Sequence, residues 1–236
     1  MLQPKNGLVA VLTLAFLLAG LSAIAQDEVT NPLNSRIRPN IDESPATVKL
    51  RMGPGNPKAG EIKSRLCQGC HGEFGNSTEP LIPKLAGQYA AYIAKQTRNF
   101  QAGIRTHQIM NAMAGTLGDK DPNDVDDVAA YFASQPKMKG SGTVENQLGK
   151  QLFLFGDREK MRLACINCHG LAGKGLEPKI SMFPVLGGQN KEYIAKQLHD
   201  FRDYTRTNSP NNIMNRIASS LTDDEIEALA EYVSVQ

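Results

Sequence analysis

The chain contains the pentapeptide Cys-x-x-Cys-His twice, and this repetition constrains its fold more than any other feature. The copies span residues 67–71 and 165–169. Two thiols three positions apart lie on one helical turn, where they can add to the two vinyl groups of one porphyrin. The adjacent imidazole can then bind the iron, so the spacing is the attachment signature of a c-type haem. The pattern predicts two covalently attached haem c groups. The cysteines are Cys67, Cys70, Cys165 and Cys168, and the proximal iron ligands are His71 and His169.

Other uses of a Cys-x-x-Cys pair fit this chain less well. Such pairs also occur in redox dithiols, zinc sites and disulfide frameworks. A four-cysteine zinc site usually has its two pairs much closer in sequence than Cys70 and Cys165, and a dithiol does not need a His after both pairs. All four cysteines belong to the two motifs, so none remains for a structural disulfide.

Length and charge narrow the class of protein further. The chain has 236 residues, enough for one large domain or two small ones, and two separate haem motifs favour two. The formal net charge is +2. Neither a basic stripe nor a recognition motif is present, so no nucleic-acid partner is expected.

Residues 1–25 have the pattern of a signal peptide. Lys5 supplies the positive start, Leu8 to Leu21 form the apolar run, and residues 23–25 read Ala-Ile-Ala, a cleavage site. The alternative is an uncleaved membrane anchor, because the apolar run is near the spanning minimum. In either case the body is expected outside the cytoplasm, in the periplasm. Residues 26–56 are rich in Pro, Asn and Ser and predict a flexible leader.

The remainder is an internal duplication, so both halves are expected to share one fold. Tyr92–Gln96 recurs letter for letter at Tyr193–Gln197. The predicted organisation is a first haem domain over 57–135, a linker over 136–143 and a second haem domain over 144–236.

Caps and apolar periodicity predict that both domains are helical. Asn56 and Pro57 suit a helix start, with a helix expected to run to Cys67. Thr222 and Glu225 form a capping box before the last helix. Further helices are expected over 89–100, from Asp121 onward and over 144–155, whereas the segment with Met110 and Met113 has no clear periodicity. The buried faces are expected to hold Val125, Val128, Ala129 and Phe132 in one domain and Ile226, Leu229, Ala230 and Val233 in the other.

The duplication also indicates the second axial ligand of each iron. Met110 lies seven residues before Leu117, and Met214 lies seven before Leu221, each at the approach to a closing helix. These methionines occupy equivalent places in the two halves and are predicted to be the sixth ligands. His107 is the reserve ligand for the first haem. Met113 and His199 have no ligand residue at the equivalent position of the other half, and His199 is expected to be a solvated helix residue.

Several stretches resemble the dihaem cytochrome c4 family, which has two tandem class I cytochrome c domains. The residues that carry the resemblance are Pro83–Gln88, Pro184–Gln189 and the repeated Tyr-Ile-Ala-Lys-Gln, and the match covers about residues 57–236. The resemblance implies an all-α fold with the domains related by a pseudo-twofold axis. It also implies that the carbonyl groups of Pro83 and Pro184 accept the N–H of the proximal histidines. The leader and an insertion at 121–123 depart from the family pattern.

Iron with six strong ligands changes charge with little rearrangement, which favours electron transfer over catalysis. The expected function is therefore a periplasmic electron carrier between respiratory donors and a terminal oxidase or reductase, and not an enzyme. The alternatives are a dihaem peroxidase, which needs an open iron site, and the cytochrome subunit of a dehydrogenase such as a sulfide-oxidising flavocytochrome. Candidates to meet the haem propionates are Arg105, Arg206, Lys95 and Lys196, although long basic side chains are usually solvated.

Overall fold

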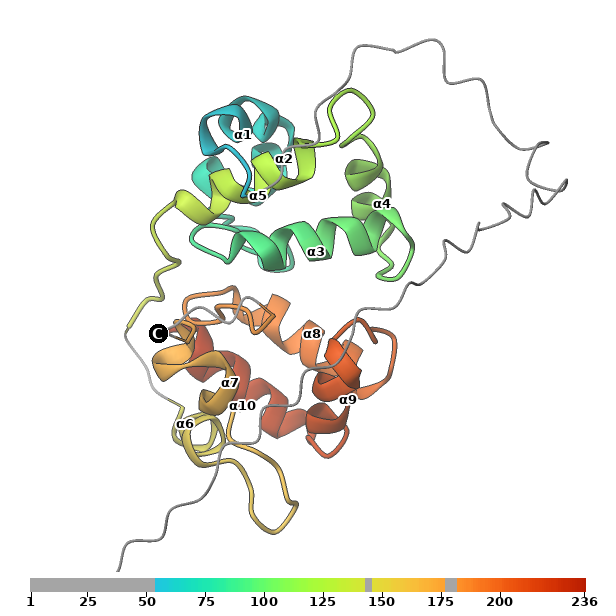
Figure 1. Cartoon of the computed structure of the whole chain (residues 1–236). Helices are drawn as coiled ribbons and strands as arrows, with labels where there is room; N and C mark the ends of the chain where they lie inside the picture. The colour runs from blue at the N-terminus through green and yellow to red at the C-terminus, as the bar shows by residue number, and fades with distance from the viewer. Residues whose placement is uncertain (1–53, 143–145, 177–181) are drawn as a thin grey trace, which may run out of the picture. The chain divides into compact units, whose positions relative to one another are not determined.

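The computed structural model describes residues 54–142, 146–176 and 182–236, which all belong to one unit, Ala46–Gln236. The expected signal peptide and most of the leader lie outside the described residues. The described part is helical, with a single isolated β-bridge between Asp157 and Arg162 (Figure 1). We call residues 54–142 the first half and 146–236 the second half. Within the described ranges, every helix is too short or too polar to cross a lipid bilayer.

Two short helices replace the single helix expected between Pro57 and Cys67. Helix α1 (Pro57–Lys63) begins at the predicted cap, because the Asn56 side chain accepts hydrogen bonds from the amides of residues 58 and 59. Ser64 then separates α1 from α2 (Arg65–His71), which carries the first haem motif. The Ser64 hydroxyl donates to the Glu61 carbonyl at 3.0 Å, a local bond that competes with a continuous helix.

Helix α5 (Asp124–Ser134) closes the first half against α1 and α3 (Ala90–Gln101). It begins later than Asp121, and its predicted apolar face is confirmed: Val125, Val128, Ala129 and Phe132 are buried. Gly60 lets α1 approach closely, because a Cβ atom there would lie 1.9 Å from the Asp127 carbonyl oxygen. The Lys63 ammonium group binds three carboxylates, those of Asp121, Asp124 and Asp127, at 2.7, 2.7 and 2.9 Å.

The segment around Met110, which lacks apolar periodicity, is helical in the structure. Helix α4 (Gln108–Gly115) is held by side-chain caps. The His107 ring accepts from the Met110 amide at 3.3 Å, and the Asn111 side chain accepts from the His107 amide at 2.6 Å. Capping of this kind leaves no periodic signal in the sequence.

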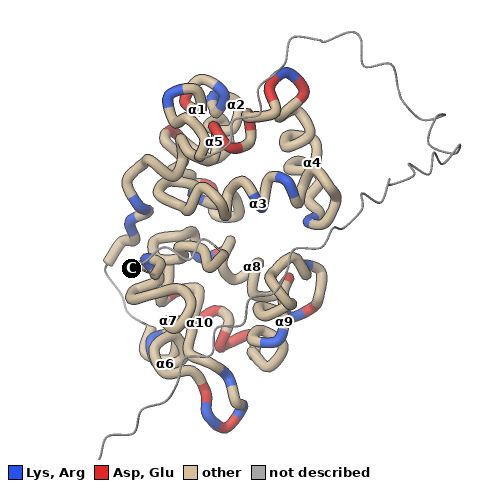
Figure 2. Tube along the Cα trace, viewed as in Figure 1, with Lys and Arg blue, Asp and Glu red and all other residues tan. Residues whose placement is uncertain are grey.

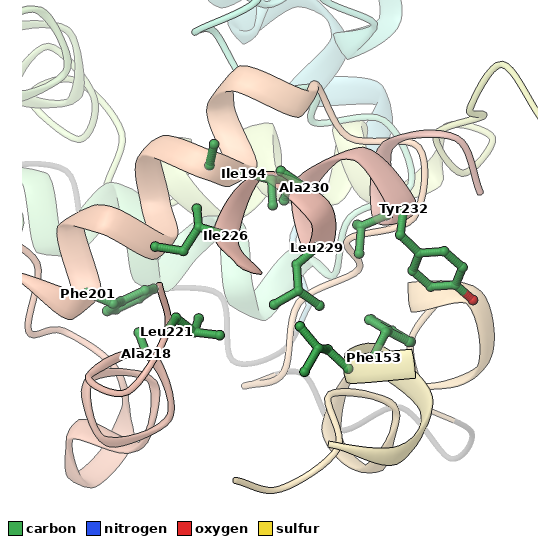
Figure 3. Packing of buried hydrophobic residues seen from close by; sticks show 12 residues of the cluster. Phe153, Ile194, Phe201, Ala218, Leu221, Ile226, Leu229, Ala230 and Tyr232 are labelled. Carbon is green, nitrogen blue, oxygen red and sulfur yellow. The ribbon is translucent and has the colours of Figure 1, made fainter. Parts of the chain in front are cut away.

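The second half repeats this plan with α6 (Gln147–Phe155), α8 (Lys191–Arg202), α9 (Ile213–Ala218) and α10 (Asp223–Ser234). The capping box of Thr222 and Glu225 is present. Figure 3 shows Ile226 of α10 lying toward Phe201 and Leu229 lying toward Phe153. Each fully buried aliphatic side chain stabilises the fold by about 2 kcal/mol. The expected buried residues Ile226, Leu229, Ala230 and Val233 are confirmed.

A charged loop between α6 and α7 (Ile166–His169) distinguishes the second half from the first. Figure 2 shows charges of both signs on this loop. Its Asp157–Arg162 bridge presents the Arg162 side chain to the Glu225 carboxylate at 3.1 Å, and Lys160 binds the same carboxylate at 2.8 Å. Glu225 therefore caps α10 and also anchors the loop.

The described part of the predicted linker, residues 136–142, is non-helical and mostly exposed, with one buried side chain. Met138 is 1% exposed and lies in a small cluster with Tyr89 and Val185, one from each half. The Gly140 amide donates to the Gln236 carbonyl at 2.9 Å. This segment is therefore part of the contact between the halves.

Candidate haem sites

Each histidine of a Cys-x-x-Cys-His motif is buried and fixed by a proline carbonyl. His71 is 7% exposed and its Nδ1 lies 2.8 Å from the Pro83 oxygen; His169 is 6% exposed and its Nδ1 lies 2.8 Å from the Pro184 oxygen. A carbonyl oxygen can only accept, so Nδ1 carries the proton and Nε2 is left free to bind a metal. Burial lowers the pKa of both rings, partly offset by the proline hydrogen bonds, and favours this neutral form.

The motif helices end in a sharp turn at Gly72 and Gly170. Their φ values are +79° and +75°, and a Cβ atom at Gly170 would lie 2.0 Å from the Gly175 oxygen. Both positions therefore require glycine.

The four cysteines are not paired with one another. Cys67, Cys165 and Cys168 are half-buried and Cys70 is exposed, with no disulfide. Before haem is attached, burial raises the pKa of the Cys165 thiol to about 11. Among the described residues, no three His, Cys, Asp or Glu side chains gather as they would in a zinc centre.

Met110 and Met214 hold equivalent positions, because the asparagines that follow them make the same bonds. Asn111 Nδ2 donates to the carbonyls of Phe100 and Arg105, at 2.6 and 3.1 Å. In the second half, Asn215 Nδ2 makes the corresponding bonds to residues 201 and 206, both at 2.8 Å. The Met-Asn pair therefore shows how the two repeats align in this segment.

A cavity of about 470 Å³ brings the predicted residues together. His71 and Met110 line it in the first half, and His169 and Met214 line it in the second, whereas Met113 is not among its lining residues. Apolar side chains complete the walls: Leu85, Ile93 and Phe100 from the first half, and Leu186, Ile194 and Phe201 from the second. Apolar walls, cysteines and a free imidazole nitrogen suit a covalently attached porphyrin. The identity of the iron ligands stays a prediction.

Arg105 and Arg206 cross between the halves beside this cavity. The Arg105 guanidinium stacks on Phe100 and donates to the Tyr193 hydroxyl at 3.1 Å. In the reciprocal arrangement, Arg206 stacks on the Phe201 ring and donates to the Tyr92 hydroxyl at 3.0 Å. Within the described residues, neither guanidinium forms a salt bridge. Burial would raise the pKa of Tyr193, but the two guanidinium groups outweigh this effect and lower it.

Three other polar candidates, His107, Lys95 and Lys196, also line the cavity, and each bonds to a neighbouring group. His107 is exposed and caps α4. His199 is one-third exposed and contacts Arg202 at 3.0 Å, as expected for a residue on a helix surface. Lys95 donates to the Asn208 carbonyl, and Lys196 pairs with Asp200 at 2.8 Å.

Sequence reasoning missed two pairs of residues around the cavity. Asn111 and Asn215 orient the segments that carry Met110 and Met214, and Gln88 and Gln189 bond between the halves. The signal was present, because Met-Asn and Gly-Gln each occur at equivalent places in both repeats.

Comparison with known proteins indicates the family of the chain. The family model for cytochrome c matches residues 61–136 and 147–235. Cytochrome c4 of Thiocapsa roseopersicina is 41% identical over 181 residues, covering 76% of this chain and 92% of that protein. A thiosulfate dehydrogenase electron acceptor of Stutzerimonas stutzeri is 36% identical over 186 residues, covering 77% of this chain and 81% of that protein. The crystal structure of reduced recombinant cytochrome c4 from Pseudomonas stutzeri has a TM-score of 0.70 and 37% identity, covering 76% of this chain and 98% of that chain.

Two consecutive matches to one haem-binding domain define a c-type cytochrome with tandem domains. The chain carries two covalently attached haem c groups. It belongs to the dihaem cytochrome c4 family, and it is an electron carrier rather than an enzyme.

Proposed function

We propose that this protein is a periplasmic carrier that takes electrons from one redox protein and delivers them to a terminal oxidase or reductase. The ligands in the first half are His71 and Met110, and those in the second are His169 and Met214. The observation that carries the proposal is the presence of one buried histidine and one equivalent methionine from each half at the same cavity. The signal-peptide pattern of residues 1–25 supports export.

The chain's own residues prepare each site for electron transfer. Haem iron supplies the one-electron redox change when it is bound. The Pro83 and Pro184 carbonyls orient the proximal rings and increase their basicity. The methionine sulfur favours the ferrous state relative to a second imidazole, so this ligand pair suits a carrier of high potential.

The ligand assignment is tested by Met214→Ala, with Met113→Ala as the matched control. The ferric holoprotein with Ala at 214 should lose about half of its sulfur-to-iron charge-transfer absorption, and one of two potentials should fall. Met113→Ala should retain the full charge-transfer absorption and both wild-type potentials. An unchanged spectrum in Met214→Ala would falsify the assignment.

A second candidate function is electron acceptor for a dehydrogenase. The specific observation is the 36% identical relative named as a thiosulfate dehydrogenase electron acceptor. Stopped-flow mixing of the oxidised holoprotein with a thiosulfate dehydrogenase and thiosulfate separates the two candidates. Reduction within the turnover time of the dehydrogenase supports the second, whereas slow reduction combined with rapid oxidation by a terminal oxidase supports the first.

A further inference from the structure

One peptide group links the proximal histidine of the first half to a glutamine of the second. His71 Nδ1 donates to the Pro83 oxygen at 2.8 Å. The N–H of that same peptide group belongs to Lys84 and donates to Gln189 Oε1, also at 2.8 Å. The C=O and N–H of a trans peptide point in opposite directions, so the two hydrogen bonds lie on opposite ends of one polarisable unit.

The second half contains the same chain of bonds in the reverse direction. His169 Nδ1 donates to the Pro184 oxygen at 2.8 Å, and the N–H of that peptide, on Val185, donates to Gln88 Oε1 at 2.9 Å. Each histidine is therefore connected through one peptide group to the opposite half. Because the arrangement occurs twice, with nearly equal distances, it is a feature of the pseudo-twofold contact.

Both glutamine side chains are held in a fixed orientation. Gln88 is 5% exposed and Gln189 is 4% exposed. Gln189 Nε2 donates to the Lys84 carbonyl at 2.9 Å, and Gln88 Nε2 donates to the Val185 carbonyl at 2.8 Å. Each amide thus bonds both backbone groups of one residue, which determines which end carries the oxygen.

Hydrogen bonds at the two ends of a peptide group strengthen each other. An acceptor on the N–H makes the carbonyl oxygen a better acceptor, which strengthens the bond from the histidine Nδ1–H. A histidine that shares its Nδ1 proton more fully is a stronger donor through Nε2. Stronger donation stabilises ferric over ferrous iron and lowers the potential.

We propose that Gln189 is a positioning residue for the first haem and that Gln88 is one for the second, so each half adjusts the electron donation of the other half's proximal histidine. This inference rests on the proposed ligation by His71 and His169. It assigns to each Gly-Gln repeat a role in the opposite domain, in addition to holding the halves together.

The test is Gln189→Met in the holoprotein, because Met retains the length of Gln but accepts no comparable hydrogen bond. Potentials are assigned to each haem by NMR of the haem methyl signals during a redox titration. We expect the potential of the first haem to rise and that of the second to move less. In the ferrous protein, the His71 Nδ1–H signal should shift upfield. Gln88→Met should produce the same changes at the second haem and at His169.

Two neighbouring residues provide matched controls, because they bond between the halves without touching these peptide groups. The Tyr89 hydroxyl donates to the Leu176 carbonyl at 3.1 Å, and Asn190 Nδ2 donates to the Ile82 carbonyl at 2.8 Å. Tyr89→Phe and Asn190→Ala weaken the contact between the halves. They should leave both potentials and both histidine signals at wild-type values.

Gln189→Glu keeps the measurement informative if the Met variant does not fold, because a carboxyl oxygen still accepts from the Lys84 amide. This variant should not raise the potential of the first haem. The proposal is overturned if Gln189→Met leaves the His71 signal in place, or if it shifts the second haem as much as the first. Failure of the ligand assignment is distinct, because it appears already in the Met214→Ala spectrum.

Discussion

Arg105 and Arg206, one from each half, share the same acceptor atom: Gln197 Oε1 lies 2.7 Å from Arg105 Nη2 and 2.6 Å from Arg206 Nη1. Both also donate to Gln96 Oε1, at 2.9 and 3.2 Å. Two cations are thus held together by neutral oxygens. We expect haem propionates to supply the negative charge that this pair requires.

Replacing one of these cations should lower both potentials. We expect Arg206→Gln to lower each by about 40 mV, or about 1 kcal/mol, because a nearby positive charge favours the ferrous state. Redox titration of the holoprotein measures the change. Arg206→Lys keeps the charge but not the forked geometry and should recover most of the loss. If Arg206→Lys lowers the potentials as far as Arg206→Gln does, the positive charge is not what raises them in the wild-type protein.

Asn215 should control how firmly Met214 stays on the iron. Asn215→Ala removes two 2.8 Å bonds from a side chain that is 0% exposed. The loss should destabilise the protein by about 2–3 kcal/mol in chemical denaturation. It should also let carbon monoxide bind the reduced second haem. A variant that is destabilised but still excludes carbon monoxide would show that Asn215 acts on the fold alone.

Helix α3 shows which features of the fold a single sequence can predict and which it cannot. Periodicity predicts a helix over residues 89–100, and in α3 Gln96 and Phe100 are buried. Periodicity cannot show what packs against the buried face of this helix, and Gln96 bonds to residues of the other half. Contacts between distant residues depend on the paired surfaces and leave no local pattern.

Local capping explains why the sequence pattern does not predict helix α4. Helix α4 was missed because His107 and Asn111 stabilise it through side-chain hydrogen bonds rather than through an apolar face. The haem motifs, the repeat and the closing helices could be predicted because covalent chemistry and apolar spacing are written directly in the sequence.

The Lys63 cluster predicts how the first half responds to pH. Burial would lower the pKa of Lys63, but hydrogen bonds to Asp121 and two further carboxylates outweigh it and raise the pKa. The hydrogen bond to Lys63 lowers the pKa of Asp121 from 3.8 to about 2. A carboxyl group with a lowered pKa stabilises the folded state above its unfolded pKa, and this contribution is lost as pH falls through the folded value.

We therefore expect Lys63→Met to destabilise the protein by about 2 kcal/mol at pH 7, because the buried Asp127 carboxylate loses a partner. The difference from wild type should stay constant down to about pH 4 and shrink between about pH 4 and pH 2. Urea denaturation of both proteins across this range measures it. A difference that grows with acidification would contradict the cluster's role.

Proton NMR of the ferrous holoprotein tests the ligation of the two irons most directly. A methionine bound to ferrous haem has its methyl group over the porphyrin, where the ring current shifts the signal strongly upfield. His/Met ligation in both halves predicts two such three-proton signals, one lost in Met110→Ala and the other in Met214→Ala. A single signal in the wild-type protein, or loss of a signal in Met113→Ala, would contradict it.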